Sequence, residues 1–209
     1  MLQLKNVTKA YNGTPVINIP DLALGPSVYW LKGANGSGKT TLLKLIAGLL
    51  PFQGNISFNG TDLLKQPLRY RNNISWSEAE PLYPPELTGA EMVSLYQRIR
   101  KASATETRSL LAAFQLDAFI NNAIGSYSAG MTKKLSLMLA FIGNPSLIIL
   151  DEPLITLDEN SFAFVSDLII QKSQQDGITF LMSSHQQPEA TLLLAGRELL
   201  LTGGNITIL

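Results

Sequence analysis

Gly33-Ala34-Asn35-Gly36-Ser37-Gly38-Lys39-Thr40 is the stretch that decides the fold of this 209-residue chain. It matches the phosphate-binding pattern G-x-x-x-x-G-K-[ST] and lies where that pattern requires, between a strand-like segment (28–31) and an apolar helix predicted over 41–50. Glycines let successive backbone N–H groups turn inward around a phosphate, and the helix N-terminus adds its positive dipole end. The alternative, a flexible Gly/Ser turn, is disfavoured by the strand and helix on either side.

The pattern predicts roles for individual residues of this loop. Lys39 is expected to bridge the β- and γ-phosphate oxygens of a nucleotide, and the Thr40 hydroxyl to ligate Mg²⁺. The full set of cofactor-binding residues predicted at the loop is Gly33, Asn35, Gly36, Ser37, Gly38, Lys39, Thr40 and Thr41.

A second motif lies far downstream, where an apolar strand predicted over 147–150 ends at Asp151-Glu152. Ligands of open parallel sheets bind beyond the carboxyl ends of the strands. Asp151 is therefore a candidate Mg²⁺ ligand, and Glu152 a candidate for polarising the water that attacks the γ-phosphorus. On its own, such an acidic pair is more often a helix cap, but the phosphate-binding loop upstream favours the catalytic interpretation.

The order of predicted elements indicates an α/β fold. Strands are predicted at 2–7, 16–24, 28–31, 147–150 and 178–182, and helices at 41–50, 132–142 and about 159–172. Their alternation predicts a mainly parallel sheet covered on both faces. Asn59-Gly60 predicts an antiparallel hairpin, and a second hairpin is expected to turn at Gly203-Gly204.

The middle of the chain changes to helical periodicity. A capping-box pattern at 88–91 precedes apolar residues at helical spacing, and a similar start follows at 103–106. We expect one domain over 1–209: a P-loop NTPase core with a mainly parallel sheet at about 1–83 and 142–209, an antiparallel β subdomain, and an inserted helical lobe at about 84–141.

Composition narrows the classes of function. Sixteen Lys and Arg balance sixteen Asp and Glu, which argues against nucleic acid as a partner. The absence of cysteine excludes disulfides, a thiol nucleophile and thiolate-bound metals. The apolar stretch 135–150 is too short to cross a bilayer and is interrupted by Gly143-Asn144-Pro145. The N-terminus lacks the apolar core of a signal peptide.

Between the two nucleotide motifs lies Tyr127-Ser128-Ala129-Gly130-Met131. A serine at such a turn is usually only a helix cap. At this spacing, however, the segment resembles a variant of the Leu-Ser-Gly-Gly-Gln signature of the ATP-binding subunits of ABC transporters, and the resemblance covers nearly the whole chain. It implies ATP and Mg²⁺ as ligands, with Ser128 and Gly130 at the nucleotide of a second subunit.

The resemblance implies further site residues. Thr156-Leu157-Asp158 resembles the family's D-loop, although Asp158 could equally be a helix cap. His185 takes the place of the switch histidine at the γ-phosphate, and Tyr11 that of the ring stacked on adenine, with a core tyrosine as the alternative. The family's Gln before the helical lobe is missing, so Glu78 or Glu80 must stand in, and Glu78 is the candidate metal ligand.

The resemblance also implies partners and activity. Two subunits, identical or paralogous, are expected to stack head to tail around ATP and to hydrolyse it with Lys39, Glu152 and His185. A separate integral-membrane permease is expected to dock near the helical lobe and 78–83, which places the chain in the cytoplasm, peripheral on the inner face of the cell membrane. The alternatives are a soluble ABC-type ATPase without a permease, and a weakly hydrolysing regulatory module suggested by the missing Gln.

Overall fold

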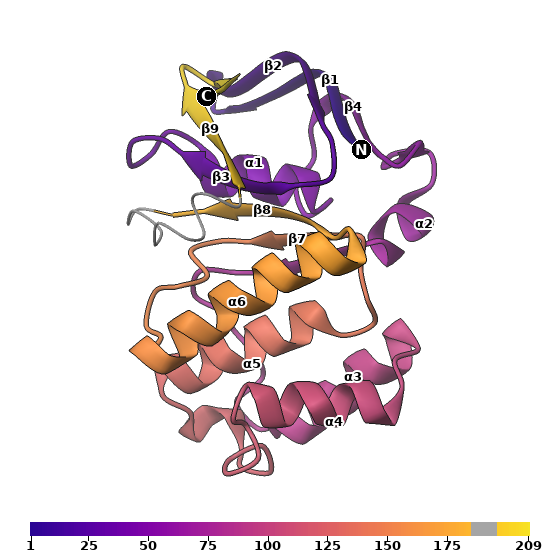
Figure 1. The fold of residues 1–209 in the computed structure, drawn as a ribbon. Helices are drawn as coiled ribbons and strands as arrows, with labels where there is room; N and C mark the ends of the chain where they lie inside the picture. Colours follow the sequence, from indigo (N-terminus) through magenta and orange to yellow (C-terminus); the bar gives the residue numbers. More distant parts are fainter. Residues whose placement is uncertain (185–195) are drawn as a thin grey trace.

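The computed structural model describes residues 1–184 and 196–209, which form two β-sheets and their covering helices in stacked layers (Figure 1). The first sheet is antiparallel, with the order β2-β1-β4-β5. Its strands are β1 (Leu2–Tyr11), β2 (Thr14–Leu24), β4 (Gln53–Phe58) and β5 (Thr61–Asp62). This sheet confirms the predicted antiparallel part of the fold.

The second sheet has six strands in the order β10-β9-β3-β8-β7-β6. They are β3 (Val28–Lys32), β6 (Ile74–Ser77), β7 (Leu147–Leu150), β8 (Thr179–Ser183), β9 (Gly196–Thr202) and β10 (Asn205–Ile208). All neighbours pair in parallel except β10, which pairs antiparallel with β9 at the edge. The mainly parallel sheet is thus confirmed, and the carboxyl ends of β3, β8, β7 and β6 meet at one edge.

Seven helical segments cover the sheets in the described part of the chain. They are α1 (Lys39–Ile46), α2 (Pro67–Asn72), α3 (Gly89–Arg100), α4 (Ala104–Ala113), the 3-10 turn η1 (Ile124–Ser126), α5 (Ala129–Phe141) and α6 (Glu159–Asp176). In Figure 1, α1 lies between the two sheets, whereas α5 and α6 lie on the opposite face of the six-stranded sheet.

Alternation along β3 explains the two hydrophobic cores. Successive side chains of a strand point to opposite faces. Tyr29 and Leu31 accordingly join the core formed with α1 and the antiparallel sheet, whereas Val28 and Trp30 join the core formed with α3, α5 and α6. Because all four side chains are buried, β3 and the loop that follows it are fixed on both faces.

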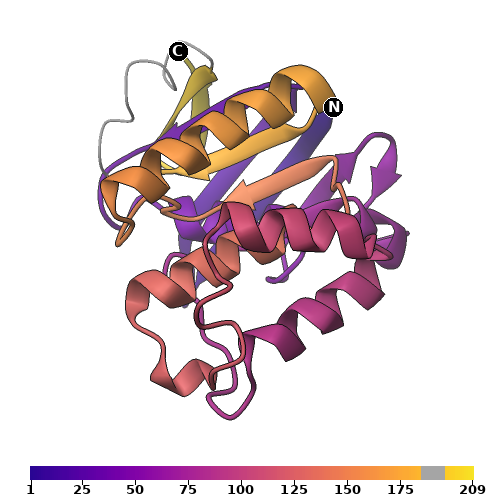
Figure 2. The same cartoon turned by 60° about the horizontal axis from the view of Figure 1, so that its bottom comes forward.

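The helical lobe begins as the capping patterns predict. The Thr88 side chain accepts the Glu91 N–H and the Glu91 carboxylate accepts the Thr88 N–H, while Ser103 caps α4. Helices α3, α4 and α5 pack against one another (Figure 2). Their buried residues share one core with those of the six-stranded sheet. The division into a nucleotide-binding core and a lobe at 84–141 stays a prediction.

Several elements differ from the expectation: β1 continues to Tyr11, α5 begins at Ala129 and α6 ends at Asp176. Helix α1 begins two residues earlier than predicted and ends at Ile46 rather than at residue 50, because Gly48 takes a left-handed φ of 73°. Helix α2 and strand β6 were not predicted. Strand β6 reads Ile-Ser-Trp-Ser, which is too short for its alternation to separate it from a loop.

Candidate functional site

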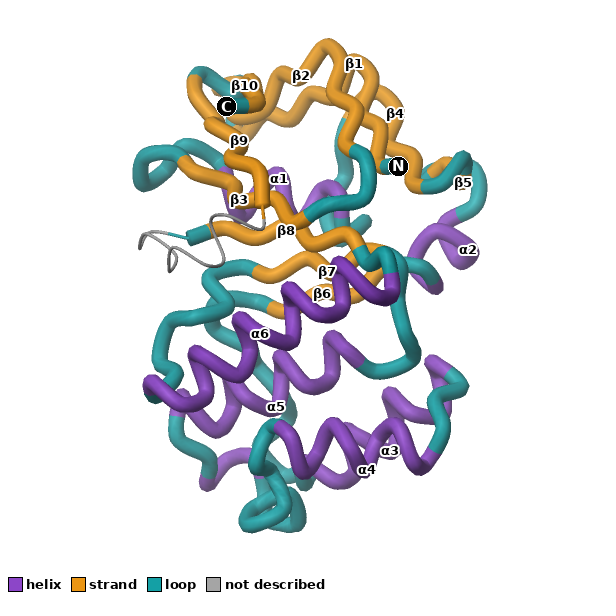
Figure 3. Tube along the Cα trace, in the orientation of Figure 1, coloured by secondary structure: helices purple, strands orange, loops and turns teal. Residues whose placement is uncertain are grey.

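The candidate site lies at the carboxyl edge of the six-stranded sheet, where the phosphate-binding loop leaves β3 and Asp151-Glu152 leaves β7 (Figure 3, left). Between these two strands runs β8, which ends at Ser183. The edge therefore joins segments that are more than a hundred residues apart in the sequence, as the switch-point argument predicts.

An open cleft of about 480 Å³ lies at this edge. Its lining includes most of the predicted nucleotide-binding residues, but not Gly33: Tyr11, Asn35, Gly36, Ser37, Gly38, Lys39, Thr40 and Thr41. The predicted catalytic residue Glu152 also lines it, as do Val16 and Ala79, which were not predicted. A larger groove of about 560 Å³ lies on β1 and β2, between Thr8 and Gln53. Because none of the phosphate-loop residues or carboxylates lines that groove, the smaller cleft is the candidate site.

The phosphate-binding loop is held by backbone geometry and by its own lysine. Gly38 has a φ of 100°, and a Cβ there would lie 2.8 Å from Val16 Cγ1, so both conformation and space require glycine. The buried Lys39 ammonium donates to the carbonyls of Gly33 (2.8 Å) and Ala34 (3.2 Å). The cation that is predicted to bind phosphate is thus already placed inside the loop.

The acidic pair is fixed by Ser183. Asp151 is 2% exposed and Glu152 7% exposed. The Ser183 hydroxyl donates to Asp151 Oδ1 (2.5 Å) and accepts the Glu152 N–H (3.0 Å). Glu152 takes a left-handed φ of 47°, a conformation that costs a non-glycine residue roughly 1–2 kcal/mol. At this turn the Glu152 side chain lines the cleft opposite the phosphate loop.

The oxygen atoms at this edge suit Mg²⁺. This hard cation binds through one or two carboxylates together with substrate phosphates rather than in an all-protein cage. Thr40 of the phosphate loop lines the cleft, whereas Asp151, directly after β7 at the same edge, does not line it. No cluster of three or more His, Cys, Asp or Glu side chains occurs among the described residues. The residues present therefore fit Mg²⁺ bound together with a nucleotide.

The Glu78 carboxylate is engaged in a different contact. It follows β6, but its Oε1 forms an ion pair with Lys44 Nζ at 2.9 Å, and it does not line the cleft. Ala79 occupies that part of the wall instead. The metal-binding role predicted for Glu78 has no support from this placement.

The structure describes one of two further predicted site residues, Tyr11, but not the other, His185. The Tyr11 side chain is 44% exposed on the wall of the cleft, with the Lys9 ammonium 5.0 Å from its ring centroid, which excludes the alternative of a core tyrosine. Stacking on adenine stays a prediction. His185 lies outside the described residues.

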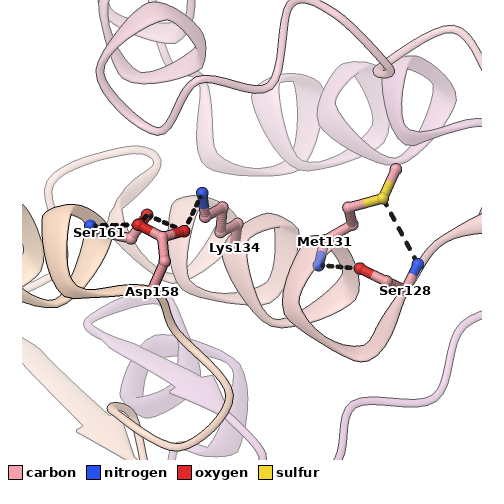
Figure 4. A network of polar contacts seen from close by, with 5 residues as sticks. All are labelled: Ser128, Met131, Lys134, Asp158 and Ser161. Atoms are coloured by element: carbon pink, nitrogen blue, oxygen red, sulfur yellow. Dashed lines mark hydrogen bonds and ion pairs between the residues drawn. The ribbon is translucent and has the colours of Figure 1, made fainter.

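The signature segment forms the N-terminus of α5 (Figure 4). The Ser128 hydroxyl accepts the Met131 N–H (3.2 Å), and the Ser128 N–H donates to Met131 Sδ (3.5 Å). Ser128 is exposed, and neither it nor Gly130 lines the cleft of its own chain. The N-terminus of α5 therefore presents its capping serine to solvent and not to the cleft of its own chain. Its contact with the nucleotide of a second subunit stays a prediction.

The D-loop segment is connected to this helix. Asp158 caps α6 by accepting the Ser161 N–H (2.9 Å), and its other oxygen pairs with Lys134 of α5 at 2.9 Å (Figure 4). The hydrogen bonds from Lys134 and Ser161 hold the pKa of the Asp158 carboxyl well below its usual range. Asp158 is thus a helix cap, and the D-loop role, in contact with a partner subunit near its nucleotide, stays a prediction.

Sequence reasoning missed Lys133 and the bonding of Ser183. Lys133 is 1% exposed, and its ammonium donates to the carbonyls of Glu78 (2.7 Å), Asp151 (3.0 Å) and Ala79 (3.2 Å). Burial lowers the pKa of Lys133 to about 8, against the opposing effect of nearby carboxylates. One signal was present: Lys133 precedes the buried Leu137 by four residues, which places both on one face of the helix.

A family model for ABC transporters matches residues 25–155, a range that contains the phosphate loop, the signature segment and the acidic pair. The chain belongs to this family. None of the described helices is long and apolar enough to pass through a bilayer.

Individual ABC proteins agree with this assignment. A spermidine/putrescine import ATP-binding protein from Mesoplasma florum is 31% identical to the chain over 99% of the chain's length. The matched region makes up 60% of that protein's own length. An uncharacterised ABC transporter ATP-binding protein from Bacillus subtilis is 29% identical over 90% of the chain and 87% of its own length. A solved ATP-binding subunit of an ABC transporter has a TM-score of 0.89, with 27% identity over the whole chain and 90% of its own length.

Proposed function

We propose that this chain binds and hydrolyses Mg·ATP and thereby drives a separate integral-membrane permease. The observation that carries the proposal is a single cleft lined by Lys39 and Thr40 of the phosphate loop and by Glu152. Phosphoryl transfer requires little covalent chemistry from the protein, because positioning and charge stabilisation supply most of the catalysis. A cleft with an ammonium and backbone N–H groups on one side and a carboxylate on the other is suited to that task.

Each residue then has a definite part in hydrolysis. The Lys39 ammonium turns from the Gly33 and Ala34 carbonyls to the β- and γ-phosphate oxygens. Asp151 and Thr40 hold Mg²⁺, which when bound neutralises phosphate charge. Glu152 orients the attacking water and accepts its proton, while ADP leaves with the bonding electron pair. By the family resemblance, His185 contacts the γ-phosphate.

A second protomer completes the site. Ser128 and Gly130 do not line their own chain's cleft, and the exposed N-terminus of α5 offers N–H groups to an anion. In a head-to-tail dimer with two-fold symmetry, each protomer places this end over the nucleotide of the other. A solved cassette of the same fold, bound to ADP and phosphate, is a dimer; it is 23% identical, with a TM-score of 0.84.

The permease-docking surface that we propose is a groove of about 220 Å³ beside Glu78. It is lined by Leu49, Trp76, Glu78, Pro81, Leu82, Tyr83, Tyr96 and Ser136. The Leu82 side chain is 90% exposed and Leu49 52% exposed, an apolar surface that favours a protein partner. By the family resemblance, we expect the docked chain to lie in the cytoplasm, peripheral on the inner face of the membrane.

Leu82→Asp should reduce copurification with the permease by about tenfold or more, because it puts a charge into an apolar contact. Hydrolysis by the isolated chain should stay within about twofold of wild type, since Leu82 is not in the cleft. Leu68→Asp, at a 77% exposed leucine on α2 outside the groove, is the matched control. An unchanged yield of permease with Leu82→Asp would contradict this docking site, and the absence of any membrane protein with the wild-type chain would favour the soluble ATPase.

A further inference from the structure

Lys133 has no part in the proposed chemistry, yet it is among the most deeply buried residues of the described chain. Removing an ammonium group from water is costly unless all of its hydrogen bonds are replaced. An ammonium has three N–H donors, and here three backbone carbonyls accept from it, at 2.7, 3.0 and 3.2 Å. A buried polar network that is fully satisfied in this way rigidifies its surroundings and specifies one arrangement.

One of the three carbonyls belongs to the peptide unit that enters Glu152. Lys133 donates to the Asp151 carbonyl, and the N–H of the same peptide unit, that of Glu152, donates to Ser183 Oγ. Both polar groups of this peptide are therefore held, one from α5 and the other from β8. This peptide sets the direction of the left-handed turn at Glu152, and hence the position of its carboxylate in the cleft.

The other two carbonyls belong to the segment after β6. Ala79 lines the nucleotide cleft, and Glu78 lines the proposed permease groove. One turn further along α5, the Ser136 hydroxyl forms a hydrogen bond of 2.8 Å with the Ser77 hydroxyl. Helix α5 is thus bonded to residues 77–79 at two levels, and Ser128 caps the same helix.

We propose that Lys133 is a positioning residue that fixes the Asp151–Glu152 peptide and residues 78–79 to α5, so that Glu152 and the Ser128 end of one protomer are held in a single arrangement. The inference rests on the proposed function. In the head-to-tail dimer, Glu152 and Ser128 of one protomer act at two different nucleotides. The hydrogen bonds of Lys133 would then connect these two sites through α5.

The test is Lys133→Met, which keeps the length of the side chain and removes the ammonium. Affinity for Mg·ATP should stay within about threefold of wild type, because the three carbonyls that accept from Lys133 belong to residues 78, 79 and 151 and not to the phosphate loop. The value of kcat should fall by about 10- to 100-fold, since displacement of a catalytic group by about 1 Å has effects of that size. Lys172→Met is the matched control, because its ammonium pairs with Asp176 on the outer surface of α6.

Lys133→Gln is a second variant, for the case that Lys133→Met does not fold. Its shorter amide has only two N–H donors and cannot hold all three carbonyls, so kcat should again fall by about tenfold or more with ATP affinity nearly unchanged. A folded Lys133→Gln chain with wild-type kcat would overturn the proposal.

Wild-type kcat in a folded Lys133→Met chain would overturn the positioning role, as would a loss of ATP affinity with kcat unchanged. Failure of the wild-type chain to hydrolyse Mg·ATP would contradict the proposed function itself. An active wild type with an equally active Lys133→Met chain would contradict the role of Lys133 alone.

Discussion

Glu152→Gln is expected to slow ATP hydrolysis by about 10²-fold or more while leaving ATP binding intact. The amide has nearly the shape of the carboxylate, so the cleft opposite Lys39 keeps its form. It cannot accept the proton of the attacking water, however, and the nucleotide stays uncleaved. With both sites filled by ATP, the variant should accumulate as a dimer that is visible by size-exclusion chromatography.

Turnover, ATP affinity and dimer content should be measured on the same preparation. Glu86→Gln is a matched control, because Glu86 is exposed and does not line the cleft. If Glu152→Gln hydrolyses ATP at the wild-type rate, Glu152 is not the base. If it is slow but remains monomeric with Mg·ATP, the catalytic role stands and ATP-driven dimerisation is contradicted.

Lys39→Ala is expected to weaken ATP binding by about 10²-fold or more. A charge-assisted hydrogen bond contributes roughly 1.5–3 kcal/mol, and the ammonium is predicted to make such bonds to both the β- and the γ-phosphate. Titration calorimetry with Mg·ATP measures this loss directly. ADP, which lacks the γ-phosphate, should lose less affinity than ATP.

The Lys39→Ala result needs a check of the fold, because Lys39 also bonds the Gly33 and Ala34 carbonyls in the free loop. Thermal unfolding of the variant provides that check, and Lys172→Ala controls for the loss of a lysine elsewhere. Wild-type affinity for ATP in a folded Lys39→Ala chain would remove the phosphate-loop interpretation.

The parts of the site that sequence predicts are those whose geometry is local. Residues 33–40 run from the end of β3 through one loop into the first turn of α1, so local backbone conformation fixes all of them relative to one another. The acidic pair was predictable for a similar reason, since it directly follows a buried strand whose carboxyl end must reach the ligand edge. The mainly parallel sheet followed from the alternation of strands and helices.

The parts that sequence did not predict depend on packing between distant segments. The carbonyl partners of Lys133 come from residues 78, 79 and 151, and no local pattern joins these to α5. The contact of Glu78 also depends on packing that the sequence pattern did not predict. The resemblance leaves Glu78 or Glu80 in place of the family's Gln. In the structure the Glu78 carboxylate pairs with the ammonium of Lys44 on α1, and its metal-binding role stays a prediction.

The central claim is that ATP is enclosed between two protomers, and a cross-link between chains tests it most directly. The chain has no cysteine, so single cysteines can be introduced as unique labels. One Glu152→Gln preparation would carry Asn35→Cys at the exposed phosphate loop, and a second, tagged preparation would carry Ala129→Cys beside Ser128. Because each preparation carries only one of the two cysteines, a product that joins both cysteines must link two different chains.

With Mg·ATP and a short bismaleimide, a mixed dimer of the tagged and untagged chains should appear, and it should be lost without nucleotide. A saturated mixture that gives no such product, although each cysteine reacts with a monofunctional maleimide, would contradict the account.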